Sequence, residues 1–143
     1  MREKRSLRDS ELLVRAGPVE YYVNNGNVSA SAYISKRKGT STSVDVDEKR
    51  SAIDIRRNLI KNLNLKSGSL PYLIYNTVEK IRSIPAYPFH APSVNNDYHC
   101  CIQDSDSVRV LSKAKAMILA SQSKYLTEDQ ILNSSISSKP LKY

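Results

Sequence analysis

Residues 51–63 constrain the fold of this 143-residue chain more than any other segment. Ser51 and Asp54 form the S-x-x-D pattern that caps the start of a helix. After them, apolar residues recur every three or four positions, which is the spacing of one helical face. The residues with this spacing are Ala52, Ile55, Leu59 and Leu63. We therefore predict a helix that begins after Ser51 and ends at Lys66-Ser67-Gly68.

Segments rich in β-branched and aromatic residues precede this helix. The pair Asn25-Gly26 predicts the tight turn of a β-hairpin, because both residues accept positive φ. Residues 28–34 alternate between apolar and polar side chains, and they fit either a half-buried strand or a short helix. The other predicted strands cover residues 12–14, 19–23 and 40–46.

The second half of the chain leaves one alternative open. Residues 70–84 fit either a helix entered through Pro71 or, from Val78 onward, a strand. Residues 85–96 hold three prolines, so we expect no regular structure there. The remaining predictions are a buried strand over residues 98–102, a long helix from about Asp106 to Ser123, and a short helix capped by Thr127 and Gln130.

This order of elements predicts an α+β fold and not a regular alternation of strands and helices. We expect a single compact domain over residues 11–133, with a small, mainly antiparallel sheet packed against two main helices. We expect a flexible basic arm over residues 1–10 and a Ser-rich flexible tail over residues 134–143 to flank this domain.

Three features of the sequence bear on the compartment. No apolar run approaches the roughly 18 residues of a membrane-spanning helix, so we expect no membrane partner. The charged first residues lack the apolar core of a secretory signal. Cys100 and Cys101 are adjacent, and neighbouring cysteines rarely pair because their Cβ atoms point apart. Together these features favour a reducing compartment, and we expect a cytoplasmic protein.

Basic residues outnumber acidic ones by 22 to 14, which gives a formal net charge of +8. Such a charge suits an acidic partner, although ordinary soluble domains also carry it. Nucleic acid is one possible partner. No nucleic-acid-binding motif is present, so binding would tolerate different base sequences and weaken with salt. The candidate nucleic-acid contacts are Lys36, Arg37, Lys38, Arg57 and Lys61.

The region around His99 holds the residues best suited to chemistry. An imidazole can serve as a general base at neutral pH. On one strand, His99 and Cys101 would share a face roughly 7 Å apart, too far for the direct hydrogen bond that a nucleophile and its base need. A simpler interpretation is that the two small cysteines fill a core and that the histidine anchors the loop.

Asp45 and Asp47 stand two residues apart in a β-rich segment, so their carboxylates would share one face of a strand. They could form an acid–base pair or hold Mg²⁺. We favour a simpler interpretation, in which the two carboxylates face solvent. Asp47 would in addition place negative charge before the helix that follows, where the helix dipole favours it.

Five potential metal ligands lie within twelve residues, but their spacing matches no zinc signature, and adjacent cysteines are poor co-ligands. We therefore predict no metal site, and we predict no cofactor. The residues considered are His90, Asp97, His99, Cys100 and Cys101.

Residues 25–33, 43–45 and 92–99 carry a combined pattern. It resembles a group of short bacterial proteins that have a G-x-V-x-x-x-A-F segment, then L-S-V-D, then a loop with proline and asparagine that ends in histidine before an apolar strand. Tyr33 takes the place of the phenylalanine, and Thr42 takes that of the leucine. The resemblance spans residues 11–120. It implies a compact single domain and makes His99, Asp45 and Ser43 the candidate catalytic residues, but it supplies no substrate. Because both segments follow a loop-to-strand transition in this pattern, we hypothesise that His99 is buried beside the strand that holds Ser43 and Asp45.

Three classes of function remain open, in this order. The chain is first expected to be a small soluble accessory or interaction protein that acts through a protein partner. The second possibility is a sequence-tolerant nucleic-acid-binding protein that uses the basic arm and the loop at residues 36–38. The third is a small enzyme with a site around His99 and Asp45. The sequence does not indicate an oligomeric state.

Overall fold

The strand that begins at Leu12 alternates its side chains between two apolar layers, and this alternation organises the fold. The computed structural model describes residues 2–65, 69–133 and 138–143. In it, Leu12 and Val14 pack into one buried cluster, whereas Leu13 packs into another. Successive side chains of a strand point to opposite faces, so a sheet with a core on each side follows.

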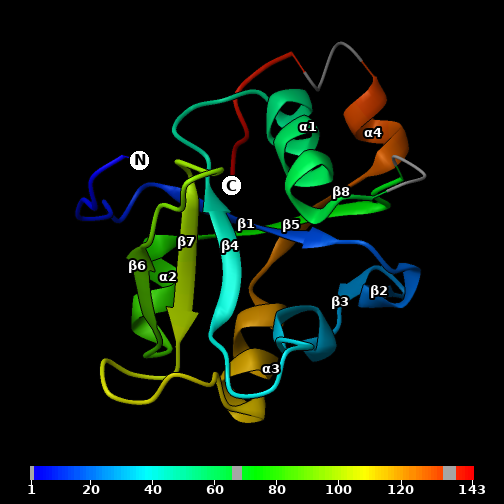
Figure 1. Ribbon diagram of the computed structural model, residues 1–143. Helices are drawn as coiled ribbons and strands as arrows, with labels where there is room; N and C mark the ends of the chain where they lie inside the picture. Colours follow the sequence, from blue (N-terminus) through cyan, green and yellow to red (C-terminus); the bar gives the residue numbers. More distant parts are fainter. Residues whose placement is uncertain (1, 66–68, 134–137) are drawn as a thin grey trace.

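The sheet has six antiparallel strands in the order β6-β7-β4-β1-β5-β8, and a separate two-stranded hairpin joins β2 to β3. Figure 1 shows β4 crossing β1 at a steep angle, so the sheet is strongly bent. The strands are β1 Leu12–Gly17, β2 Val23–Asn24, β3 Asn27–Val28, β4 Thr42–Val46, β5 Tyr72–Thr77, β6 Tyr87–His90, β7 His99–Gln103 and β8 Lys124–Thr127.

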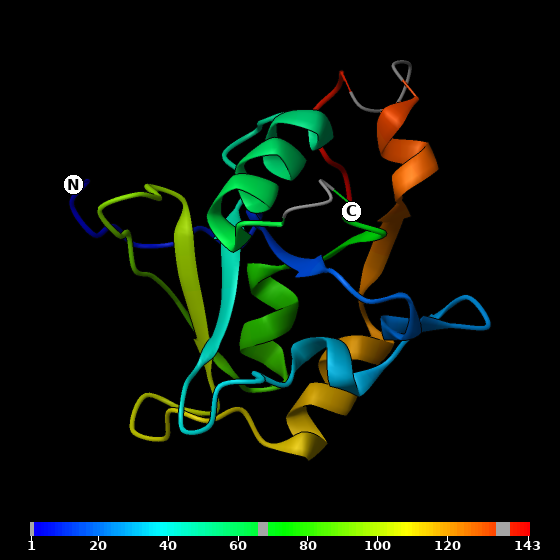
Figure 2. The same ribbon diagram turned by 45° about the vertical axis from the view of Figure 1, so that its right-hand side comes forward.

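Helices cover both faces of the sheet (Figures 1 and 2). The cluster on one face includes residues of α1 and α4, and the cluster on the other includes residues of α2, α3 and the 3-10 helix η2. The α-helices are α1 Ala52–Leu63, α2 Val78–Ser83, α3 Lys113–Ser121 and α4 Glu128–Leu132, and the 3-10 helices are η1 Glu20–Tyr22 and η2 Ala30–Tyr33. The predicted α+β class, with an antiparallel sheet packed against helices, is confirmed.

The best local predictions rest on capping and turn chemistry. The Ser51 side chain accepts the N–H of Asp54 at the start of α1, as the sequence predicted. The helix ends at Asn64, which adopts the left-handed conformation (φ 52°) and caps it. The predicted Asn-Gly turn joins β2 to β3, with φ of 52° at Asn25 and 78° at Gly26. The predicted terminator at residues 66–68 lies outside the described residues.

Several predicted elements differ from the structure. The strand expected over residues 19–23 is mostly the 3-10 helix η1, and the segment at residues 28–34 is mainly η2. Neither alternative for residues 70–84 holds as stated, because residues 72–77 form the strand β5 and the helix α2 begins only at Val78, where a strand was the alternative. The Thr77 side chain caps this helix. The long helix expected from Asp106 begins only at Lys113, where Ser112 provides the cap. Strand β8 was not predicted.

The proline-rich stretch is also more regular than expected, because β6 lies within it. This strand is at the edge of the sheet and pairs only with β7, with Pro88 opposite Ile102. Proline lacks an N–H, so it is tolerated on an edge strand where one side of the backbone makes no ladder bonds. The expectation of no regular structure over residues 85–96 is therefore wrong for residues 87–90.

The first ten residues were expected to form a flexible arm, but residues 2–10 pack on the domain. Leu7 is buried in the core, and the backbone N–H of Arg5 donates to Nδ1 of the buried His90. The Arg5 guanidinium also binds the carboxylates of Glu11 and Glu48. Arginine and its two partners are partly removed from water, so these ion pairs hold the segment in place.

The end of the chain returns to the domain as well. Leu141 is buried in the cluster that includes α1, and Pro140 forms a bridge with Ser51. Within the tail expected over residues 134–143, these contacts anchor residues 140 and 141, and residues 134–137 lie outside the described part. No helix within the described residues is long and apolar enough to cross a membrane.

We predict that the Arg5 ion pairs stabilise the fold in a pH-dependent way. Burial raises the pKa of Glu11, but Arg5 and the Arg8 N–H lower it more, so the pKa of Glu11 lies below its ordinary value of 4.5. The stabilisation is therefore present above pH 4.5 and is lost as the pH falls through the folded-state pKa. Glu11→Gln should lower the free energy of unfolding at pH 7 by about 1–2 kcal/mol.

Urea unfolding of the wild type and Glu11→Gln between pH 7 and pH 3 measures this effect. The difference between the two proteins should shrink as the pH falls. Glu3→Gln is the matched control, since Glu3 is exposed in the same segment, and it should change little at any pH. A difference that stays constant over the whole range would contradict the prediction.

Candidate functional site

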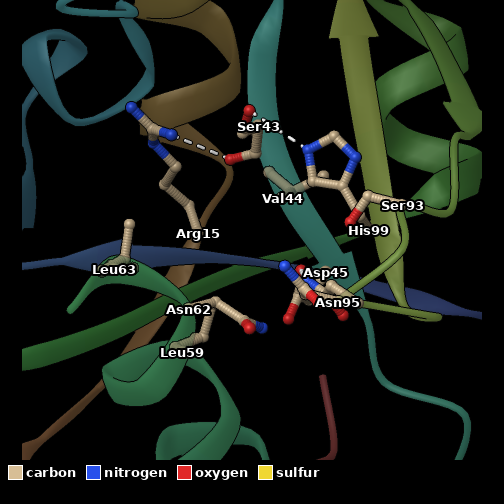
Figure 3. Close-up of a pocket in the computed structure, with 12 residues that line it drawn as sticks. Arg15, Ser43, Val44, Asp45, Leu59, Asn62, Leu63, Ser93, Asn95 and His99 are labelled. Carbon is tan, nitrogen blue, oxygen red and sulfur yellow. Dashed lines mark hydrogen bonds between the residues drawn. The ribbon is translucent and has the colours of Figure 1, made fainter.

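A cleft of about 330 Å³ lies where the C-terminal end of α1 meets β1, β4, β7 and the loop before β7 (Figure 3). It sits on the face of the sheet that α1 covers only in part. Polar side chains come from every element around it. The lining residues include Arg15, Ser43, Asp45, Asn62, Asn95 and His99.

Ser43 and His99 form a hydrogen-bonded pair in this cleft. Strands β4 and β7 are antiparallel, with Ser43 opposite Cys101 and Asp45 opposite His99. Alternation along each strand puts Ser43, Asp45 and His99 on the same face. His99 Nδ1 lies 2.8 Å from the carbonyl oxygen of Ala91, and Nε2 lies 3.3 Å from the Ser43 hydroxyl oxygen.

These two bonds define the tautomer of His99. A carbonyl oxygen can only accept a hydrogen bond, so His99 Nδ1 carries the proton and donates a hydrogen bond to the Ala91 carbonyl oxygen. Nε2 is then an unprotonated acceptor, and the Ser43 hydroxyl donates to it. Ser43 is exposed and His99 is half-buried, so the pair is reachable from the cleft. This is the arrangement in which an imidazole can take a proton from a hydroxyl.

Asp45 is the buried acid of the cleft. Its side chain is 2% exposed, and Oδ1 accepts a hydrogen bond of 2.9 Å from the Asn96 amide. Oδ2 is buried with no hydrogen-bond partner among the described residues. Burial raises the pKa of Asp45, although the Asn96 bond and the charges of Arg50 and His99 oppose the rise. An incompletely paired carboxylate costs folding free energy, and such groups concentrate at functional sites.

Arg15 fills the gap that opens between β1 and β4. Only Leu13 and Val14 of β1 pair with β4, after which the two strands separate. The Arg15 guanidinium spans this opening and donates to the carbonyl oxygens of Ser43 (2.8 Å) and Ala32 (3.0 Å). Burial lowers the pKa of Arg15. Figure 3 shows Arg15 and His99 on opposite sides of Ser43.

Arg50 supports the cleft from the turn after β4. Its guanidinium stacks over the Tyr98 ring at 3.5 Å and donates to the carbonyl oxygens of Val46 and Asp47. Burial lowers the pKa of Arg50, and the negative charge of Asp45 opposes this change. Arg50 thereby ties the end of β4 to the start of β7, which helps to fix the relative positions of Asp45 and His99.

The structure brings together the three residues that the sequence singled out for catalysis, His99, Asp45 and Ser43. The interpretation of Asp45 and Asp47 as solvent-facing is wrong, because they are 2% and 7% exposed. The Asp47 carboxylate accepts the backbone N–H of Leu12 and ties β1 to the end of β4. Because Asp45 and Asp47 alternate with Val44 and Val46, the sequence pattern is that of a strand with one buried face and one exposed face. This pattern does not reveal that both faces are buried.

The cleft also contains residues that sequence reasoning missed. Arg15 carried a usable signal, because it interrupts the apolar run Leu12-Leu13-Val14, and a charge within a buried strand needs a partner. Asn62 and Asn95 carried none, since asparagine is common at helix ends and in loops. Their place at the cleft depends on how α1 and the loop before β7 meet.

The cysteines do not form part of this site. Cys100 points into the core on the other face of the sheet, and burial raises the pKa of its thiol to about 12, so it is a poor nucleophile. Cys101 is half-buried opposite Ser43, and both thiols are free. Within the described residues, no group of three or more His, Cys, Asp or Glu side chains could hold a metal ion.

The predicted nucleic-acid contacts lie on two separate elements. Lys36, Arg37 and Lys38 are exposed on the loop between η2 and β4, and Lys36 lies 5.9 Å from the centre of the Tyr22 ring. Arg57 and Lys61 are exposed on α1, where Arg57 pairs with Asp54. Figures 1 and 2 show the two segments apart. They therefore do not form one continuous basic strip.

No protein-family profile, curated protein or solved structure matches this chain in the three comparisons. The comparisons supply neither a family nor a function. The resemblance to the group of short bacterial proteins stays a prediction. The cleft must therefore be interpreted from its own geometry.

We predict that Asp45→Asn stabilises the protein. The folded state raises the pKa of Asp45 above its ordinary value of 3.8, so the ionised side chain weakens folding at neutral pH. Removing the charge should raise the free energy of unfolding at pH 7 by about 1 kcal/mol, the order of one unpaired buried polar group. The gain should vanish below pH 3.8, where Asp45 is protonated in both states.

Urea unfolding at several pH values tests this prediction. Asp47→Asn is the matched control, because Asp47 is a second buried aspartate that accepts a backbone hydrogen bond. We expect no stabilisation from Asp47→Asn. If Asp45→Asn instead destabilises the protein at pH 7, the prediction is contradicted. That result would mean that the carboxylate is fully paired in the folded state.

Proposed function

We propose that this chain is a small hydrolase that cleaves an ester or amide bond in the cleft, with Ser43 as nucleophile and His99 as general base. The observation that carries the proposal is the bond from the Ser43 hydroxyl to His99 Nε2, with Nδ1 held by the Ala91 carbonyl oxygen. A nucleophile, its base and a third group that orients the base are the components of nucleophilic catalysis. Of the three functions expected from the sequence, this geometry favours the enzyme.

The reaction follows from the positions of these atoms. Ser43 Oγ attacks the acyl carbon, and its proton passes to His99 Nε2. The bond from that carbon to the leaving group then breaks, and the leaving group takes the proton from His99. Water attacks the acyl-enzyme and gives a proton to His99, and this proton returns to Ser43 as the acid product leaves.

Two charged residues assist this sequence without forming covalent bonds. Arg15 is held on the Ser43 carbonyl oxygen, so its positive charge lies beside the nucleophile, where negative charge develops on the substrate. Asp45 lies opposite His99 in the sheet and favours the imidazolium that forms when His99 accepts the proton. We assign positioning and electrostatic roles to both residues.

The size and lining of the cleft point to a small, partly polar substrate. A volume of about 330 Å³ is near the lower limit for ligand pockets, so a short acyl group suits it better than a long chain. Leu59 and Leu63 of α1 supply apolar surface, and Asn62 and Asn95 supply amide groups. We expect short-chain esters to be better substrates than long-chain ones.

A fluorophosphonate probe tests the nucleophile directly. Ser43 Oγ should attack its phosphorus atom and displace fluoride, which adds the mass of one probe molecule less hydrogen fluoride to the intact protein. Ser43→Ala should abolish this adduct. His99→Gln should slow its formation at least about 100-fold, which is the usual contribution of a general base. Intact-protein mass spectrometry over time gives the rates.

Ser93→Ala is the matched control, since Ser93 also lines the cleft but no described hydrogen bond links its hydroxyl to His99. It should be labelled at the wild-type rate. Hydrolysis of p-nitrophenyl acetate and longer esters supplies the second readout, with the same order among the variants. A wild-type protein that gains no adduct, or gains one that survives Ser43→Ala, refutes the proposed function.

A further inference from the structure

Exposed aliphatic side chains gather around α3, away from the cleft. Nine large apolar residues are exposed within the described part of the chain, and five of them lie on three neighbouring segments. These segments are the loop at residues 34–41, the loop at residues 104–112 and α3 itself. The five residues are Ile34, Val108, Val110, Met117 and Ile118. We call them the α3 patch.

The three segments are held together at one end of the molecule. Helix α3 packs against η2, and the loop that begins at Ile34 follows η2 directly. The loop at residues 104–112 leads into α3 and is closed at its base by Asp104, which accepts the Ser112 N–H and pairs with Lys115. Figures 1 and 2 both show the three segments at the same end.

The three segments that carry the α3 patch are also rich in basic residues. The same segments carry Lys36, Arg37, Lys38, Arg109 and Lys113, all of them exposed. None of these five forms an ion pair with another described residue. Asp104 already pairs with Lys115, so Asp106 is the remaining acidic residue of the three segments. Exposed apolar side chains that share their segments with unpaired basic residues are complementary to a partner surface that is apolar and negatively charged.

We propose that the α3 patch binds an acidic amphipathic helix of a protein partner. Such a helix would lay its apolar face on Met117 and Ile118 and turn carboxylates toward the basic residues of the same segments. Methionine adapts its shape to different partners, and it is more than half exposed here (56%). The patch is aliphatic and lacks exposed aromatic rings, so it offers bases no stacking surface. This inference is independent of the hydrolase proposal.

The test uses a labelled synthetic peptide with leucine along one helical face and glutamate elsewhere. Fluorescence anisotropy measures its binding to the full chain. Met117→Ser with Ile118→Ser should weaken binding at least about tenfold, as expected for central apolar contacts. Reversal of Lys36, Arg37 and Lys38 to glutamate should weaken it similarly and reduce its dependence on salt.

Matched controls distinguish binding at the α3 patch from nonspecific binding elsewhere on the surface. Leu132→Ser removes an equally exposed apolar side chain on α4 (57%), and Lys61→Glu reverses an exposed charge on α1. Both should leave binding unchanged, and circular dichroism should show that every variant folds. Equal binding of a scrambled peptide with the same composition would overturn the proposal, as would unchanged binding by the α3 variants.

Two other ligands serve as competing outcomes. One is a single-stranded DNA of mixed sequence, and the other is a vesicle of equal parts phosphatidylcholine and phosphatidylserine. Binding of either through the α3 patch, together with no binding of the peptide, would overturn the proposal in favour of that ligand. Preference for the peptide over both would support it.

Discussion

The pairing register of β4 with β7 is the constraint on which the cleft depends. Ser43 and Asp45 reach the same face as His99 only because Asp45 pairs with His99 and Ser43 with Cys101. A shift of one residue would turn β7 over relative to β4 and send the imidazole into the core. Val44 and Cys100 hold the register from the other side, since both are buried there. The apolar core thus fixes the geometry of the polar site.

Two energetically unfavourable features meet in the cleft. A buried carboxylate oxygen of Asp45 lacks a hydrogen-bond partner among the described residues, and an arginine occupies the opening between two strands. Natural sequences tolerate such costs at functional sites, where a group must be ready to bind something from outside. Oε1 of Gln122 is also buried without a hydrogen-bond partner among the described residues, so this feature alone does not mark a site. The cleft is distinguished because its incompletely paired carboxylate lies beside the hydrogen-bonded pair of Ser43 and His99.

Sequence reasoning succeeded where the signal is local. The cap at Ser51 and the turn at Asn25-Gly26 involve neighbours in the chain, so both could be predicted. Strands β6 and β8 could not, because edge strands tolerate proline and lysine and depend on their partners. The grouping of Ser43, Asp45 and His99 was predicted from the resemblance. Arg15 was missed because its role arises only where β1 separates from β4.

The packed N-terminal segment also changes how the chain should be shortened. Residues 2–10 look dispensable in the sequence, yet Leu7 fills a place in the core and Arg5 covers two carboxylates. Deleting them would leave Glu11 buried without its arginine and remove the hydrogen bond to His90 at the end of β6. A newly exposed apolar surface beside an edge strand invites pairing with another chain. A shortened version of the chain should therefore keep residues 2–10.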